Sequence, residues 1–156
     1  MSYKKTLLAV GPSIFAFPAL IVLAAAVAAP LGNGLLGYPS GERFYAFLSD
    51  ICHQFPTRSF WLFDHPLAIC ARCTGGYLGI TAGVLAVMLT KGPTGRSYLA
   101  MGAALFVAAV LEGYIGLSDG NIWRAISGFV GGYGLMLLIR SASAVLFLKL
   151  RLIPNH

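Results

Sequence analysis

Charged side chains are scarce in this sequence. They make up 10% of its 156 residues, whereas 58% of the residues are hydrophobic and the mean hydropathy is +0.79. A soluble domain of this length needs a charged surface, so the scarcity of charge excludes that class. Long uncharged runs are instead typical of a chain whose solvent is lipid. We therefore expect an integral membrane protein, with the lipid bilayer as its main partner.

Acidic residues are the rarest charged group, and the formal net charge is +6. A positive charge can indicate nucleic-acid binding, but here Lys and Arg occur at the ends of apolar runs and in short connections. Membrane proteins place basic residues there for orientation. The sequence has no basic patch with interleaved aromatic residues on a polar scaffold. We therefore expect no nucleic-acid partner.

Four apolar runs are long enough to cross a bilayer, which takes roughly 20 residues per helix. They cover about residues 7–29, 69–90, 97–117 and 122–148. The first run ends in alanines that resemble a signal-peptide cleavage region, but it is longer than the usual signal core of about 7–15 residues, and we expect it to be retained. The sequence thus predicts an all-α, polytopic fold: one transmembrane domain over residues 1–156, built as a four-helix bundle.

Orientation follows from the basic residues, because loops rich in Lys and Arg stay in the cytoplasm. One side of the predicted spans has the larger number of them: Lys4, Lys5, Lys91, Arg96, Arg140, Lys149 and Arg151. The other side has Arg43, Arg58, Arg72 and Arg124. We therefore predict a multi-pass protein of the inner (cytoplasmic) membrane, with both termini in the cytoplasm and the first loop outside.

Glycines recur at every fourth position in two of the predicted spans. Gly75, Gly79 and Gly83 lie in the second span, and Gly128 and Gly132 lie in the fourth. Small residues at this spacing allow helix backbones to approach closely in lipid. They predict tight packing within the bundle, and the same faces are candidates for docking on membrane-protein partners or on a second copy of the chain.

The connection from residue 30 to residue 68 is the only long one, and it contains or adjoins all three cysteines. It is rich in aromatic residues, which argues against disorder. Apolar positions over residues 42–51 recur with the period of a helix, which predicts a short amphipathic helix at the membrane surface. A loop of this length in a small protein is usually functional.

The cysteines of this region are accompanied by histidines. Cys52 and His53 precede Cys70 and Cys73 by a spacing that resembles zinc sites, and three thiolates with one imidazole are a ligand set of structural zinc. Cys70 and Cys73 share one face at the start of a helix, which Pro66 can help to open. His65 is an alternative fourth ligand, and iron or copper also suit such a site. The plainest alternative is three buried cysteines that act as small hydrophobic residues.

Two other functions fit the same residues. A helix N-terminus and the intervening Arg72 stabilise a thiolate, which favours thiol–disulfide chemistry linked to a quinone. Membrane oxidoreductases of that kind generally use two cysteine pairs, and this chain has three cysteines. The non-enzymatic alternative is an accessory subunit of a larger membrane complex.

Polar residues gather at the predicted outer end of the last two spans. Glu112, Asp119 and Arg124 lie near the short connection there, on the same side as the cysteines. Charges in spans usually face the interior of the bundle and mark functional sites, so we take these three residues as candidate catalytic residues, with Glu112 or Asp119 as the general base. The alternative is a Glu112–Arg124 ion pair that fixes the register of the two helices.

Several motifs together resemble a known family. They are Cys52-His53-Gln54, Arg58-Ser59-Phe60, Cys70-Ala71-Arg72-Cys73-Thr74-Gly75 with Gly79, and Asp119-Gly120-Asn121 with Arg124 and Gly128. The set, which spans roughly residues 49–132, is similar to a family of small bacterial and archaeal predicted membrane proteins of unknown function. The resemblance implies a four-span fold and supplies no activity. The chain departs from the family pattern at Glu112, where related proteins have an Asp and a longer polar connection.

Overall fold

The structure is a computed structural model that describes residues 3–37, 40–89, 95–116 and 119–151. The predicted span ends at Thr90 and Leu117, and the basic residue Lys91, lie outside the described residues. The elements in chain order are α1 (Tyr3–Leu35), α2 (Glu42–Ser49), the 3-10 turn η1 (Pro56–Arg58), β1 (Trp61–Leu62), β2 (His65–Pro66), α3 (Ala71–Leu89), α4 (Arg96–Ile115) and α5 (Asn121–Arg151).

Four helices are long and apolar enough to cross a membrane. The apolar segments run over Ile14–Leu35, Ala71–Leu89, Arg96–Ile115 and Asn121–Val145. They correspond to the four predicted spans and confirm the all-α, polytopic fold. Arg140, which we counted at the cytoplasmic end of the last span, is buried within α5 at 8% exposure.

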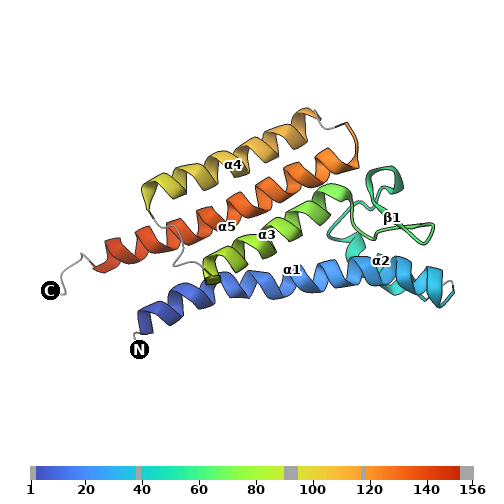
Figure 1. Cartoon of the computed structure of the whole chain (residues 1–156), viewed down its shortest axis with the longest axis horizontal. Coiled ribbons are helices and arrows are strands. Elements are labelled where there is room, and N and C mark those ends of the chain that lie inside the picture. Colours follow the sequence, from blue (N-terminus) through green and yellow to red (C-terminus); the bar gives the residue numbers. More distant parts are fainter. Residues whose placement is uncertain (1–2, 38–39, 90–94, 117–118, 152–156) are drawn as a thin grey trace.

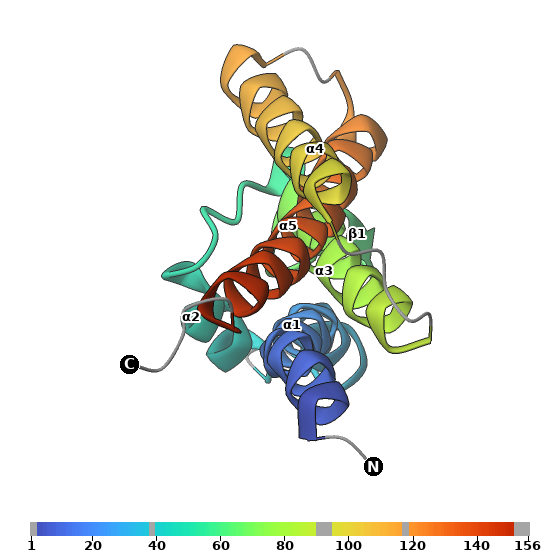
Figure 2. The same cartoon turned by 90° about the vertical axis from the view of Figure 1, so that its left-hand side faces the viewer.

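The four long helices pack in the spatial order α1, α3, α5, α4. α5 lies between α3 and α4, and α1 packs mainly on α3 (Figures 1 and 2). α4 is therefore the most peripheral span, and its apolar side chains Val107, Val110 and Leu111 are more than half exposed. The first turn of α1 and the last turn of α5 lie at one end, and α2 with the β-hairpin lies at the other (Figure 1).

The predicted glycine faces pack within the chain. A Cβ added at Gly75 or Gly79 would collide with the carbonyl oxygen of Ala125 or Phe129 in α5. In the reverse direction, a Cβ at Gly128 would collide with the carbonyl oxygen of Arg72 in α3. α3 and α5 thus touch backbone to backbone, as the spacing of the glycines predicted.

The first connection begins later than expected, because α1 continues through Pro30 to Leu35. Pro30 is fully buried in the helix rather than the start of a loop. Beyond it, the side-chain oxygen of Asn33 accepts a hydrogen bond of 2.6 Å from the backbone N–H of Gly41. Since a Cβ at Gly41 would collide with the carbonyl oxygen of Ala29, the chain can return against α1 only with glycine there. This contact places α2 beside the end of α1.

The connection contains the predicted short helix and an unpredicted hairpin. α2 covers Glu42–Ser49 and buries Leu48. β1 and β2 form an antiparallel pair around Phe63 and Asp64, whose φ angles are +51° and +60°. Hairpin turns of this kind usually contain glycine, which is absent here, so the hairpin could not be predicted from its turn residues. Pro66 belongs to β2, and our expectation that it helps to open the next helix was wrong.

A buried cluster ties these pieces to the membrane helices. It contains Val22, Ala25, Ala26 and Ala29 from α1, Leu48 from α2, and Cys52, Ala68 and Ile69 from the connection. Cys70, Cys73 and Tyr77 pack against it. This core fixes the segment around Cys52 over the beginning of α3.

Candidate functional site

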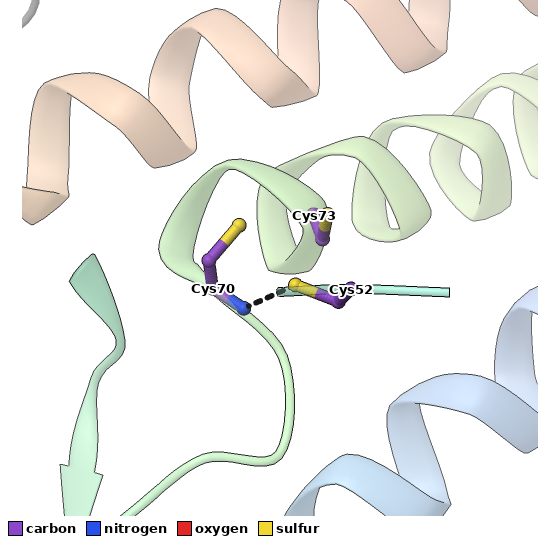
Figure 3. A group of neighbouring side chains, drawn as sticks. All are labelled: Cys52, Cys70 and Cys73. Atoms are coloured by element: carbon purple, nitrogen blue, oxygen red, sulfur yellow. Dashed lines mark hydrogen bonds between the residues drawn. The ribbon is translucent and has the colours of Figure 1, made fainter. Parts of the chain in front are cut away.

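The three cysteines come together at the end of the molecule that carries α2 and the hairpin. The sulfur atoms of Cys52, Cys70 and Cys73 all lie within 4.8 Å of one another, and all three residues are free thiols (Figure 3). Among the described residues, they are the group of side chains that can hold a metal ion. The sequence placed these residues in one site, and the structure brings them together.

The start of α3 positions two of the sulfurs. The backbone carbonyl of Cys70 accepts hydrogen bonds from the backbone N–H of Thr74 at 2.9 Å and from its hydroxyl at 3.1 Å. Cys70 is thus the capping residue, and Cys73 lies in the first turn. The N-terminus of a helix carries a partial positive charge that stabilises thiolates. Two cysteines in this position are therefore suited to act as anionic ligands.

Cys52 reaches the cluster from the loop after α2. It is 5% exposed, and its sulfur accepts a hydrogen bond of 3.1 Å from the backbone N–H of Cys70 (Figure 3). The pKa of the Cys52 thiol is held well below its usual range by hydrogen bonds from the thiols of Cys70 and Cys73, and then by the backbone N–H groups of Cys70 and Gln54. Burial opposes this effect and is the weaker influence. The surroundings of Cys52 therefore favour the thiolate form of this side chain.

The loop around Cys52 is held by side-chain hydrogen bonds. Gln54, which has a φ of +52°, donates from its amide to the backbone carbonyl of Tyr45 at 2.7 Å. The hydroxyl of Tyr45 donates in turn to the backbone carbonyl of Pro66. Burial raises the pKa of this hydroxyl, with a further contribution from the charge of Glu42. α2, the hairpin and the Cys52 loop are thus joined in one network.

A cavity of about 280 Å³ lies beside the sulfurs. It is lined by the cysteines and by Ile51, His53, Phe55, Arg58, Arg72 and Arg124. His53 is exposed and stacks on Phe55 with ring centroids 5.9 Å apart, so its ring is not among the close ligand atoms. His65 faces Leu62 across the hairpin and does not line this cavity.

Glu112 is paired, but with a different arginine than expected. Nη2 of Arg72 lies 3.2 Å from Oε2 and 3.4 Å from Oε1 of Glu112. Arg124 instead donates to the side-chain oxygen of Asn121 at 3.2 Å. The prediction of a Glu112–Arg124 ion pair is therefore wrong, because among the described residues Glu112 pairs with Arg72. The guanidinium of Arg72 reaches α4 because Gly113 has no side chain there: a Cβ at that position would lie 3.2 Å from its Nη1.

The other candidate residues are divided between the cavity and its surroundings. Arg124 lines the cavity, whereas Glu112 and Asp119 do not. Asp119 is exposed. The amide of Asn121 donates to the carbonyl of the buried Ser59 at 3.0 Å, which anchors the loop to α5. Arg58 was not assigned to the site from the sequence. The Arg58-Ser59-Phe60 motif was the feature that could have indicated its role.

Comparison with known proteins supports the importance of this segment. Residues 52–138 match a family described as predicted membrane protein (DUF2085), and the match begins at Cys52. An uncharacterized protein of Methanocaldococcus jannaschii is 35% identical over 101 residues, which cover 61% of this chain and 65% of the relative. An uncharacterized protein of Methanothermobacter thermautotrophicus is 29% identical over 94 residues, which cover 58% and 85%. No solved structure matches the chain.

Proposed function

The chain belongs to the DUF2085 family of predicted membrane proteins, and we propose that it binds a zinc ion through Cys52, Cys70 and Cys73. The observation that carries the proposal is the convergence of the three free thiols within 4.8 Å. Tetrahedral zinc with Zn–S distances of about 2.3 Å holds its sulfurs about 3.8 Å apart. Only a small contraction of the cluster is needed to reach that geometry.

We assign the fourth zinc ligand to His53. Its ring lines the same cavity as the sulfurs, and it follows Cys52 directly in the chain. To bind, the imidazole has to leave its stacked position on Phe55. His65 is less suited, since it is held in the hairpin away from this cavity. Iron and copper accept the same donors, so the identity of the metal is part of the test.

The surrounding charges suit an anionic metal centre. Three thiolates around a divalent ion leave a net negative charge, which needs nearby cations in a site of low dielectric. Arg58, Arg72 and Arg124 line the cavity and supply them. Three cysteines that merely filled space would not need such neighbours. The arginines therefore favour a thiolate site over a purely apolar cluster.

Thiol–disulfide chemistry is the second candidate. The low pKa of Cys52 beside two other thiols favours it, because the thiolate is the attacking species. Oxidation of two of the thiols to one disulfide releases two electrons and two protons, which a quinone can accept as it becomes a quinol. The third cysteine would then remain as a thiol. A bound metal excludes this reaction by occupying the thiolates.

We place the metal centre on the extracytoplasmic side of the inner membrane. The first turn of α1 and the last turn of α5 lie at the end of the molecule opposite α2 and the cysteines (Figure 1). Lys and Arg are more frequent in the sequence at that opposite end. Thiols that face an oxidising compartment tend to form disulfides. A resident metal ion would protect them there.

Metal content and free thiols, measured on the same detergent-purified protein, test the proposal. We expect one zinc ion per chain, its loss in Cys70→Ser, and thiols that react only after a chelator is added. His53→Ala should weaken binding, whereas the control His65→Ala should not. Protein without metal, but with a disulfide that dithiothreitol opens, would overturn the zinc site and support the redox alternative.

A further inference from the structure

A second cavity lies within the membrane-spanning part of the molecule. It has a volume of about 350 Å³ and is a groove on α5 between α3 and α4. Its floor contains Gly128, Gly131 and Gly132, and its walls are formed by small and apolar residues that include Gly76, Phe106, Ala109 and Val110. α4 packs on α5 rather than on α3 (Figure 2), and residues of all three helices line the groove.

The groove meets the cavity beside the cysteines. Arg72 and Cys73 line both spaces. An apolar groove at membrane depth thus ends at a cavity with Arg58, Arg72 and Arg124 in its wall. No acidic side chain lines either space among the described residues. This arrangement suits a molecule with an anionic head and an apolar tail.

We propose that the two cavities together bind one anionic membrane phospholipid, with its phosphate among Arg58, Arg72 and Arg124 and an acyl chain in the α3–α4–α5 groove. The planar guanidinium group matches phosphate oxygens and donates two hydrogen bonds at once. Basic pockets between membrane helices are a recurring type of site for lipid head groups. The volumes of about 280 and 350 Å³ are close to the lower end of the range for ligand pockets, roughly 300–1,000 Å³.

One donor atom gives the head group a specific place. The Nε of Arg72 is buried and has no hydrogen-bond acceptor among the described residues, although the same guanidinium is fixed to Glu112 through Nη2. A buried donor without an acceptor destabilises the folded state. Arg72 lines the adjoining cavity, and a shift of its side chain would uncover this donor for a phosphate oxygen there. Arg58 and Arg124 add further positive charge, and neither forms an ion pair within the described part of the chain.

The inference does not depend on the metal. A metal–thiolate centre removes part of the positive charge of the cavity, but the three arginines still exceed the negative charge of Glu112 and such a centre. The groove is built from residues that have no metal ligand among them except Cys73. Lipid binding and metal content can therefore be measured independently on the same sample, so that failure of one is distinguishable from failure of the other.

Native mass spectrometry of the full chain, with added phosphatidylglycerol or phosphatidylcholine of identical acyl chains, tests the head group. We expect one phosphatidylglycerol molecule to stay bound to the protein under collisional activation that removes phosphatidylcholine. A nearby basic residue contributes about 1 kcal/mol to the binding of an anionic lipid, so Arg58→Gln and Arg124→Gln should each weaken retention about fivefold. Arg43→Gln, an exposed arginine of α2 outside the cavity, is the matched control and should have no effect.

Filling the groove tests the acyl chain. A Cβ at Gly76 would meet its nearest neighbour, the carbonyl oxygen of Gly128, at an ordinary 3.8 Å, so Gly76→Leu adds bulk to a residue that lines the groove and its first side-chain carbon meets no clash. We expect this variant to lose the retained lipid. Ala108→Leu, which adds bulk on the exposed face of α4, should keep it.

Three results would overturn the inference. They are equal retention of the two phospholipids, an effect of Arg43→Gln as large as that of Arg124→Gln, and unchanged retention in Gly76→Leu. Soluble glycerol 3-phosphate serves as the probe for the head group alone. If it competes at concentrations comparable to those of the lipid, the site recognises free phosphate esters and the assignment to a lipid is wrong.

Discussion

Arg72 and Glu112 connect two membrane helices that each pack mainly on a third. The 3.2 Å contact between Nη2 of Arg72 in α3 and Oε2 of Glu112 in α4 joins these two helices near the cysteines. The two side chains are 35% and 22% exposed, which places the pair between a surface ion pair and a buried one. Arg72 also lines the cavity of the thiols. Glu112 therefore acts on the site by holding this arginine in place.

The first prediction concerns this pair. In a double-mutant cycle of Arg72→Gln and Glu112→Gln we expect a coupling energy of about 1 kcal/mol, because each single change leaves a partly buried charge without its partner. This corresponds to a difference of about 2–4 °C in Tm for a chain of this size. Thermal unfolding in detergent measures it. The cycle of Glu112→Gln with Arg124→Gln is the control, and a coupling of equal size there would contradict the observed pairing.

The second prediction compares substitutions at two glycines. Gly128 lies in the α3–α5 contact, and Gly76 lies at its edge. Gly128→Ala places a Cβ against the carbonyl oxygen of Arg72, so the two helices must move apart. Overpacking of this kind costs about 1–3 kcal/mol, which should lower Tm by several degrees. Gly76→Ala has room for its Cβ and should leave Tm nearly unchanged. Equal effects of the two substitutions would show that the helices do not pack as described.

Hydropathy was sufficient to predict the four spans, because a bilayer imposes length and apolarity on every helix that crosses it. It was insufficient at the end of α1, where Pro30 looked like the start of a loop. In the structure Pro30 is buried within the helix, and the turn of the chain occurs where Gly41 meets the backbone of Ala29. That close contact is a tertiary feature without a local signal.

The cysteine site was also predictable only in part, because some of its contacts are local and others are tertiary. Cys70 and Cys73 are three residues apart at a helix start, which local geometry places on one face. Cys52 joins them through the packing of α2 and Leu48 against α1, a tertiary contact that the spacing between Cys52 and Cys70 suggested but could not specify. The partner of Glu112 was not predictable, since the path of Arg72 depends on the missing side chain of Gly113.

The third prediction concerns stability at alkaline pH. The pKa of Tyr45 is raised from 10.0, mainly by burial, so the folded state binds this proton more tightly than the unfolded state does. Its contribution to stability is fully present below pH 10 and is lost as the pH rises from 10 through the higher pKa of the folded state. Tyr45→Phe removes this dependence, together with the hydrogen bond to Pro66. Urea unfolding in detergent at several pH values between 8 and 11 measures both effects.

For this variant we expect a loss of about 1 kcal/mol at pH 8 from the missing hydrogen bond, and a shallower fall in stability above pH 10 than in the wild type. Tyr98→Phe, on an exposed residue of α4, is the control and should leave both features as they are. An unchanged alkaline slope in Tyr45→Phe would mean that this hydroxyl ionises equally easily in the folded and unfolded states.

The last prediction concerns the effect of metal binding on the stability of the fold. A ligand that binds only the folded state stabilises it, and thiolate sites of zinc do not exist in an unfolded chain. Because the cluster lies where α2, the Cys52 loop and α3 meet, removal of the metal should loosen the loop first. We expect a chelator to lower Tm and to expose the segment around Gln54 to proteolysis, while α3, α4 and α5 remain packed through their glycine contacts. Cys70→Ser should be insensitive to the chelator and should resemble the chelated wild type, whereas His65→Ala should still respond. A chelator effect that persists in Cys70→Ser would place the metal elsewhere, because this substitution removes one of the three sulfurs of the proposed site.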